Sequence, residues 1–416
     1  MSVVGSQQHT LLVLLGQLRA HWRHDRNLPA RIQHLLARNR SFGSRDRRLY
    51  RELIYTALRY LPWIEPELTA APERASELIA WLAADIPATA LFRRQLLTGW
   101  PACPPSVQEK AAVLNARRSG SSADGERPSH FSPDDLFPRW LKNECPEAFA
   151  AAQCDALQSR SPLWLRLNPE TKTDVLQEFE TRGWQLEPSS VLGTAVRVLT
   201  EADVTQSESF KKGRFEIQDL GSQLILESTG LSAGGLWLDA CAGAGGKTLQ
   251  LAQMIGPAGR VDAFDVRIAA LRELAARAAR ARLQNIRILT TPPKDLYDGV
   301  LVDAPCTGSG TWRRAPHLKW TTAEADVAKA AVLQGDLLTA NSALVRKGGQ
   351  LIYATCSLAR SENEAVVNQF LQTNMDFEIE SPHQAFGGRV SAHGLTFLPA
   401  THDSDGFFVA AFRRAR

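Results

Sequence analysis

The sequence predicts a doubly wound α/β fold for residues 219–416, and two observations support this prediction. Five short apolar runs have the composition of strands that are buried on both faces. Helical patterns over 247–255, 267–284 and about 324–345 lie between them, and this alternation is typical of a parallel sheet covered by helices. The five runs are LWLDA (236–240), VDAFD (261–265), IRILT (286–290), GVLVD (299–303) and GQLIYAT (349–355).

The first part of the chain is expected to be helical. Over residues 8–115, leucines recur at helical spacing. One helix is predicted to begin near Ser44 and to stop at Pro62, because serine favours helix starts and proline cannot continue a helix. Its apolar face consists of Leu49, Leu53, Ala57, Leu58 and Leu61.

The middle of the chain is predicted to hold a linker and a mixed region. Residues 117–130 are small and polar and contain glycine and proline, so they cannot bury enough apolar surface to become ordered. A helical segment is expected over 134–159. Two short strands are expected further on, at WLRLN (164–168) and AVRVL (195–199).

The length of 416 residues agrees with two or three domains, since one domain holds roughly 100–200 residues. The longest purely aliphatic run, Leu11 to Leu15, is far shorter than the ~20 residues that cross a bilayer. No secretory leader opens the chain, so no membrane partner is expected. The predicted domains are a helical one over 1–130, a small mixed one over 131–218 and the α/β domain over 219–416.

The six cysteines exclude two further classes of protein. None forms a C-x-x-C pair, so neither a zinc site nor a disulfide framework is predicted, and a reduced, cytoplasmic protein is expected. Cys103, Cys145 and Cys154 are interpreted as small apolar residues without a functional role.

Basic charge is concentrated at the beginning of the chain. Residues 1–60 hold eleven arginines against three acidic residues, a net charge of +8, whereas the whole chain has +4. Such a block favours a polyanionic partner. A solvated helix face in a chain poor in lysine is the alternative, and charge alone does not decide between the two.

A glycine-rich turn, DACAGAGGKT (239–248), follows the first predicted strand. Its glycines let the backbone approach a dinucleotide, S-adenosylmethionine (SAM) or a phosphate closely. Gly246-Lys247-Thr248 also matches the end of a P-loop, although a P-loop needs glycine at position 241, where this chain has cysteine. Asp265, after the second strand, favours a nucleoside because its carboxylate can accept both ribose hydroxyls. Capping of the next helix is the alternative role for Asp265.

Two further strand ends carry cysteines, in DAPCTGSG (303–310) and YATCS (353–357). A thiolate that adds to carbon 6 of cytosine makes carbon 5 nucleophilic enough to take a methyl group from SAM. An acid must then donate to ring nitrogen 3, and a second group must assist the loss of hydrogen 5 and of the enzyme sulfur. Two cysteines and a carboxylate at one edge of a sheet fit this chemistry.

These motifs resemble the RNA cytosine-5 methyltransferases of the Nol/Nop/Sun group, in which they occur in the same order and spacing. The similarity extends to WLRLN (164–168), FEIQDLGSQ (215–223), RRAPHLKW (313–320) and DGFFVAAF (405–412). The segment 43–60 is similar to the NusB-like helical domain of the bacterial RsmB branch, which modifies a cytosine in small-subunit ribosomal RNA. The segment 131–147 is similar to the one that leads into the catalytic part of that branch.

The resemblance implies a Rossmann-like SAM-dependent methyltransferase domain, an all-α NusB-like N-terminal domain and a small mixed α/β domain between them. It implies that Cys356 attacks carbon 6, that Cys306 assists product release and that Asp303 contacts the cytosine ring and SAM. Asp265 would bind the ribose. The methionine end of SAM would be wrapped by Cys241, Ala242, Gly243, Ala244, Gly245, Gly246 and Lys247.

The implied partner is RNA, ribosomal RNA in the first place and transfer RNA as the alternative. No metal is implied, and nothing in the pattern demands more than a monomer. Thr290-Thr291 stands where the family commonly carries an acidic residue near the adenine, so no adenine contact is assigned. Ala244 stands where proline is usual, and close backbone approach does not require that proline.

Four basic residues follow Cys306 and are expected to hold phosphates around an unstacked target base. They are Arg313, Arg314, His317 and Lys319. A solvated loop is the alternative for this segment. For the whole chain, the alternative functions are a P-loop-like NTPase and a non-catalytic RNA-binding protein of ribosome assembly.

Overall fold

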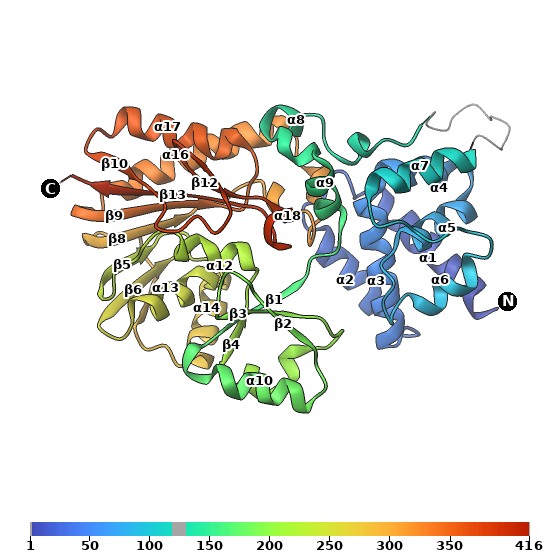
Figure 1. Cartoon of the computed structure of the whole chain (residues 1–416), viewed down its shortest axis with the longest axis horizontal. Helices are drawn as coiled ribbons and strands as arrows, with labels where there is room; N and C mark the ends of the chain where they lie inside the picture. The colour runs from blue at the N-terminus through green and yellow to red at the C-terminus, as the bar shows by residue number, and fades with distance from the viewer. Residues whose placement is uncertain (1, 119–129, 416) are drawn as a thin grey trace. The chain divides into compact units, whose positions relative to one another are not determined.

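The computed structural model describes residues 2–118 and 130–415, so most of the predicted linker 117–130 lies outside the described residues (Figure 1). The chain divides into two compact units, Met1–Arg160 with Trp312–Ala323, and Ser161–Thr311 with Glu324–Arg416. The predicted boundaries at 130 and 218 differ from this division. Residues 131–160 pack with the helical unit, and the mixed region after Ser161 shares a unit with the α/β domain.

The first unit is helical, as predicted. The predicted helix start at Ser44 is confirmed, where the Gly43 N–H donates to the Asp46 carboxylate at 2.9 Å. That helix ends at Arg59, and Pro62 lies in the first turn of the next one. The α-helices of the unit are α1 (Val3–Arg19), α2 (Leu28–Arg38), α3 (Ser44–Arg59), α4 (Leu61–Ala70), α5 (Pro72–Leu82), α6 (Ala90–Leu96), α7 (Val107–Arg118), α8 (Leu141–Glu144), α9 (Ala151–Gln158) and α15 (Leu318–Thr321).

The core of the helical unit is built from the predicted leucine stripes. Leu11, Leu53 and Leu61 have no exposed surface, and Trp63 and Trp81 fill the space between the helices. Burial of such side chains contributes about 1.5–3 kcal/mol each relative to exposure. Packing of one apolar stripe per helix therefore holds these short helices together.

The second unit begins with a small antiparallel sheet in the order β2-β3-β1-β4. The two strands predicted here are confirmed as β1 (Leu163–Leu167) and β3 (Ala195–Val198). Phe179 of α10 (Lys172–Thr181) packs on Phe215 of this sheet, with ring centroids 5.6 Å apart. The other elements are β2 (Leu186–Pro188), β4 (Phe215–Ile217) and α11 (Glu208–Lys211).

The large sheet contains the five predicted strands, all parallel, in the order β7-β6-β5-β8-β9. The chain runs outward from β5 through β6 to β7 and then crosses to β8, so the order reverses between β5 and β8. A reversal of this kind opens a crevice at the carboxyl ends of the two strands. The strands are β5 (Gly235–Asp239), β6 (Gly259–Phe264), β7 (Ile286–Leu289), β8 (Tyr297–Asp303) and β9 (Val345–Thr355).

Helices cover both faces of the large sheet (Figure 1). Figure 1 shows α12 (Leu220–Glu227), α13 (Gly246–Ile255) and α14 (Ile268–Arg280) along one face, and α16 (Glu324–Ser342) and α17 (Glu364–Thr373) along the other. Two apolar clusters result, one on each face. This burial on both faces explains why the strand sequences are apolar without alternation.

The carboxyl-terminal part of the chain adds antiparallel strands, which the sequence analysis did not predict, to the five parallel ones. β13 (Phe407–Arg414) pairs antiparallel with β9, and further antiparallel strands continue from it. These strands are β10 (Phe377–Glu380), β11 (Arg389–Ser391) and β12 (Gly394–Phe397), and α18 (Pro399–His402) precedes β13. Chain pairing, which no local pattern encodes, decided their direction.

Candidate active site

The candidate site lies at the carboxyl ends of β5, β6, β8 and β9. Asp239 and Asp303 end β5 and β8, which are neighbours in the sheet. Asp265 follows β6, and Cys356 follows β9. Because parallel strands present their carboxyl ends on one edge, four residues that are far apart in sequence come together there.

The glycine-rich turn between β5 and α13 is a tight loop. Gly243 and Gly245 have φ angles of +53° and +90°, a region that side chains rarely adopt. A Cβ atom at Gly245 would lie 2.7 Å from Leu274, so a side chain there would also clash with α14. The Gly245 N–H donates to the Ala242 carbonyl at 2.9 Å, which closes the turn. The backbone is thus free to approach a ligand at the start of α13, as predicted.

Asp265 fixes one side of this loop. Its carboxylate accepts hydrogen bonds from the Gly243 N–H at 2.8 Å and from the Arg267 backbone N–H at 2.8 Å, and it pairs with the Arg267 guanidinium at 3.0 Å. Burial alone would raise its pKa, but these hydrogen bonds lower it below the ordinary value of an aspartate. An ionised Asp265 is therefore anchored at the place where the ribose contact was predicted.

The two residues that suggested a P-loop are bound to carboxylates. Lys247 is almost fully buried, and its Nζ lies 2.8 Å from Asp303 Oδ2. The Thr248 hydroxyl donates to Asp239 Oδ2 at 2.7 Å. A P-loop lysine and threonine instead serve phosphates and a magnesium ion, so this geometry does not support the NTPase alternative.

Asp239, the last residue of β5, directly precedes the loop and is buried. Burial raises its pKa to about 7, to which the nearby charge of Asp303 contributes, while the Thr248 hydrogen bond opposes the shift. Burial also raises the pKa of Cys241 to about 12. The thiol of Cys241, in the loop, therefore keeps its proton at neutral pH.

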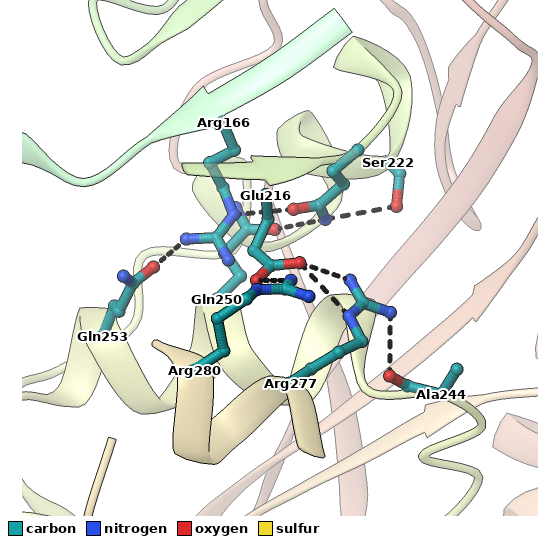
Figure 2. Close-up of polar contacts among 9 residues, drawn as sticks. Arg166, Glu216, Ser222, Ala244, Gln250, Gln253, Arg277 and Arg280 are labelled. Carbon is teal, nitrogen blue, oxygen red and sulfur yellow. Dashed lines mark hydrogen bonds and ion pairs between the residues drawn. The ribbon is translucent and has the colours of Figure 1, made fainter. Parts of the chain in front are cut away.

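A network that the sequence analysis missed holds the loop from the other side (Figure 2). Arg277 of α14 donates to the Ala244 carbonyl at 2.8 Å and to Glu216 of β4 at 2.9 and 3.1 Å. Figure 2 shows Arg280 reaching the same carboxylate. Glu216 is buried. Arg277 therefore connects Glu216 of the small sheet to the Ala244 carbonyl of the glycine-rich loop, inside the second unit. The Ala/Arg/Leu pattern of α14 gave no signal that distinguished Arg277 from its neighbours.

Cys306 and Cys356, predicted to act together, are brought together by the structure. Their sulfur atoms are 3.2 Å apart, a distance at which one thiol can donate to the other sulfur. The hydrogen bond with Cys356, followed by burial, raises the pKa of Cys306 well above that of a free thiol. The pair therefore consists of one thiol that retains its proton and a partner sulfur in direct contact with it.

The basic segment after Cys306 corrects the sequence analysis. Arg313, His317 and Lys319 are buried in the helical unit, with 3 % or less of their surface exposed. Arg313 donates to the Ser159 hydroxyl at 2.7 Å, and Lys319 donates to the Arg59 carbonyl at 2.8 Å and to Gln158 at 2.7 Å. These three side chains hold the unit together and do not face a phosphate backbone. Arg314 alone of the four is exposed.

Two observations of the described residues concern metals and membranes. Within 2–118 and 130–415, no group of His, Cys, Asp and Glu side chains has the arrangement of a metal site. No helix of the described chain is long and apolar enough to cross a membrane. Thr290 and Thr291 lie exposed directly after β7, and no adenine contact is assigned to them.

A glycine-rich loop after the first parallel strand, an acidic residue after the second and a carboxylate after the fourth define the class of SAM-dependent methyltransferases. The family model of the 16S rRNA methyltransferase RsmB/F matches residues 229–413. Ribosomal RNA small subunit methyltransferase B of Serratia proteamaculans is 30 % identical over 405 residues, which cover 89 % of this chain and 91 % of that protein. The chain belongs to the RsmB/F methyltransferase family.

Two other proteins support this membership. A probable ribosomal RNA small subunit methyltransferase B of Synechocystis is 33 % identical over 299 residues, 67 % of each chain. The crystal structure of a methyltransferase homologue from Pyrococcus horikoshii superposes with a TM-score of 0.58 at 25 % identity, covering 72 % of this chain and 98 % of that one. The α/β fold with a helical N-terminal region is thus confirmed, and SAM is the cofactor.

The residues present fit SAM. A Cβ atom at Gly246 would meet no heavy atom within 4 Å, so the backbone at the start of α13 borders open space that a cofactor can occupy. Asp265 supplies an ionised carboxylate beside the loop. The Lys247–Asp303 pair joins the loop to the strand end that precedes Cys306. The particular contacts of the predicted loop residues, Cys241 to Lys247, stay predictions.

Proposed function

We propose that this methyltransferase methylates carbon 5 of a cytosine in small-subunit ribosomal RNA through a covalent cysteine adduct. The observation that carries the proposal is the pair of sulfur atoms, 3.2 Å apart, at the sheet edge that also holds Asp303 and the cofactor loop. Methyl transfer to oxygen or to an exocyclic nitrogen needs no enzyme thiol, whereas carbon 5 of cytosine needs a nucleophile at carbon 6 first.

In the proposed reaction Cys356 is the nucleophile. Its thiolate forms a bond to carbon 6, and the electron pair of the 5,6 double bond makes carbon 5 nucleophilic. Asp303, which pairs with Lys247, is proposed to contact the ring and to accept a hydrogen bond from nitrogen 3. Nitrogen 3 takes one proton from water when the sulfur adds to carbon 6, and it returns that proton when the sulfur leaves. SAM supplies the electrophilic methyl group when it is bound. Hydrogen 5 then leaves as a proton to water, the carbon–sulfur bond breaks and its electrons return to Cys356.

Cys306 is proposed to assist the release step. Its thiol lies in hydrogen-bond contact with the Cys356 sulfur, so it can stabilise the thiolate that departs from carbon 6. The raised pKa of Cys306 supports this role because the thiol keeps its proton at neutral pH.

The choice of ribosomal RNA rests on the relatives, two of which bear the name of a small-subunit ribosomal RNA methyltransferase. Transfer RNA is the alternative substrate. An RNA-binding role of the NusB-like helical domain, the cytoplasmic location and the monomeric state stay predictions. A target base would have to be unstacked or flipped to reach the cysteines.

A methyl-transfer assay with ribosomal RNA and with transfer RNA tests the proposal. Digestion of the product and mass spectrometry against authentic 5-methylcytidine identify the methylated atom. We expect 5-methylcytidine from small-subunit ribosomal RNA. A methylated nucleoside other than 5-methylcytidine would overturn the chemistry, and 5-methylcytidine in transfer RNA alone would overturn the substrate. No transfer to either RNA, with SAM still bound, would favour the non-catalytic assembly protein.

A further inference from the structure

Glu362 is a buried carboxylate to which the sequence analysis gave no role. It lies in the 3₁₀ turn Arg360–Glu362 after β9 and has no exposed surface. Each of its carboxylate oxygens accepts two hydrogen bonds. The donors are the Thr307 N–H (2.9 Å), the Thr307 hydroxyl, the Ser357 hydroxyl (2.6 Å) and the Gln334 amide (2.9 Å).

The charge of Glu362 is met by hydrogen bonds and not by a cation. Among the described residues, none of the ion pairs includes Glu362. A carboxylate without exposure is costly to bury unless donors satisfy its oxygens. Four donors on one carboxylate indicate that the surrounding loops are built around it.

The donors belong to the two loops that carry the cysteines. Thr307 directly follows Cys306, and Ser357 directly follows Cys356. Gln334 of α16 also binds the first loop, because its amide donates to the Pro305 carbonyl at 3.0 Å. We call Glu362 and these donors the cysteine clamp. The residues before and after Cys306 are therefore tied, through one carboxylate, to the residue after Cys356.

Further contacts lock the two loops in the same arrangement. The Gly310 N–H donates to the Cys356 carbonyl at 3.0 Å, and the Ser309 and Ser357 hydroxyls are 3.0 Å apart. The Asn363 amide, next to Glu362, donates to the Ser357 carbonyl at 2.9 Å. The distance between the two sulfur atoms is thus set by a polar network, with Glu362 as its only charged member among these contacts.

We propose that Glu362 is a positioning residue that holds Cys306 and Cys356 in contact and makes them chemically unequal. This inference deepens the proposed function, on which its catalytic meaning rests. The hydrogen bonds of Glu362 fix the geometry of both loops, and its negative charge disfavours a second negative charge on Cys306. The first proton therefore leaves Cys356, which becomes the nucleophile, and Cys306 keeps its proton.

The electrostatic surroundings of Cys306 agree with this assignment. Cys356 and Glu362 both act to raise its pKa, and the charge of Cys306 in turn raises that of Tyr353. Asp303 lies three residues earlier, and its negative charge is already paired with Lys247. The hydrogen bond with Cys356 and burial are the largest causes of the raised pKa of Cys306, and the charges of Cys356 and Glu362 add to them, so together they oppose a thiolate on Cys306.

The attack of Cys356 on carbon 6 involves the transfer of one proton and the formation of one bond at sulfur. Cys356 loses one proton to water, its sulfur forms a bond to carbon 6, and the Cys306 thiol donates a hydrogen bond to that sulfur before attack and after release. Glu362 does not touch the substrate and exchanges no proton. Its effect is exerted through the two cysteines alone.

Alkylation of the full-length protein by iodoacetamide, with the modified cysteine identified by mass spectrometry across pH 6 to 10, tests the inference. In the wild type we expect Cys356 to react first. In Glu362→Gln we expect the reaction of Cys306 relative to Cys356 to rise about tenfold, the effect of about one pKa unit. Glu362→Asp keeps the charge but shortens the side chain, so we expect wild-type selectivity and about tenfold slower methyl transfer.

Glu364→Gln is the matched control. Glu364 is two residues further on and pairs with Arg389 at 3.2 Å, away from both cysteines, so its alkylation pattern and methyl transfer should equal those of the wild type. SAM binding by calorimetry shows whether each variant is folded.

The inference is overturned if Glu362→Gln binds SAM and keeps the wild-type selectivity at every pH. If Glu362→Gln fails to bind SAM, Glu362→Asp decides, since unchanged methyl transfer in that variant also overturns the inference. A shift in selectivity in Glu362→Gln, combined with a wild type that makes no 5-methylcytidine, supports the clamp and refutes the proposed function. The two failures are therefore distinguishable.

Discussion

The cysteine loops and the basic segment RRAPHLKW follow one another in the chain, yet their polar side chains serve opposite purposes. Cys306 and Cys356 remain partly exposed at the edge of the large sheet. Arg313, His317 and Lys319, from seven residues after Cys306 onward, are buried in the helical unit. The comparison teaches that a polar residue beside an active-site motif is not thereby part of the site. What decides is whether its donors are already satisfied inside the protein.

The buried basic side chains and the two cysteines differ in their hydrogen-bond partners. The buried basic side chains donate to acceptors inside the helical unit, as Lys319 does to the Arg59 carbonyl and to Gln158. These donors are therefore not directed at a phosphate. The thiol of Cys306 has the other thiol as its partner. A cation buried with carbonyl partners stabilises a fold, whereas two thiols in contact bring little stability and retain their reactivity.

The largest expected effect is that of Cys356→Ala. Removal of the proposed nucleophile should reduce methyl transfer by at least about 10³-fold while SAM binding is retained. Calorimetry with SAM and a methyl-transfer assay check both parts. Cys306→Ala is the companion variant, and we expect it to accumulate a protein–RNA adduct visible on a denaturing gel. Full activity of Cys356→Ala would end the proposed mechanism, and absence of an adduct would remove the release role of Cys306.

The second largest effect concerns the buried basic segment of the helical unit. Lys319→Ala should lower the free energy of unfolding of the helical unit by about 2–4 kcal/mol, because it leaves a cavity and two unpaired acceptors in the core. Urea unfolding at pH 7 measures the change. Lys142→Ala, at a lysine whose side chain is 68 % exposed, is the control and should change little. Unchanged stability of Lys319→Ala would return this residue to the list of RNA contacts.

A third, smaller effect concerns the network behind the cofactor loop. Arg277→Gln removes the contact with the Ala244 carbonyl and the two hydrogen bonds of Arg277 to Glu216, while Arg280 still pairs with Glu216. The loop therefore loses its link to Glu216. We expect about tenfold weaker SAM binding, corresponding to about 1.4 kcal/mol, with an unchanged Kd for RNA. Arg272→Gln, on the same helix, provides a control. An equal loss of affinity for SAM and for RNA would indicate general misfolding of the unit.

The smallest effect concerns the pH dependence of stability. Because the pKa of Asp239 is raised to about 7 in the folded protein, the folded state holds a proton that the unfolded chain releases at lower pH. Asp239 therefore lowers stability as pH rises from about 4 to 7, by about 1 kcal/mol per pH unit within that window.

Asp239→Asn should remove this part of the slope, as measured by urea unfolding at pH 5, 6 and 7. Asp336→Asn, at an exposed position of α16, should keep the wild-type slope. An identical slope in Asp239→Asn and the wild type would show that Asp239 is ionised in the folded protein throughout this range.

The sequence by itself determined the parallel strands and the residues at their ends, because apolar runs and glycine-rich turns are local features with local physical causes. It located Asp265, Cys306 and Cys356 correctly at one edge, since the strand order of such folds follows from their alternation with helices. The family of the chain followed from the same motifs.

Only the tertiary structure decided the rest, since each remaining feature depends on contacts between distant segments. The direction of the strands after β9 is set by their pairing with β13, and that of β13 by its pairing with β9. Lys319 is buried because its acceptors, Gln158 and the Arg59 carbonyl, lie 161 and 260 residues earlier in the chain. Glu362 lies in a polar turn whose sequence resembles an exposed surface turn. It is buried between the two cysteine loops because Thr307 and Gln334, which are distant in sequence, donate to its carboxylate. A side chain's partners fix whether its charge is solvated, structural or functional, and those partners are chosen by packing.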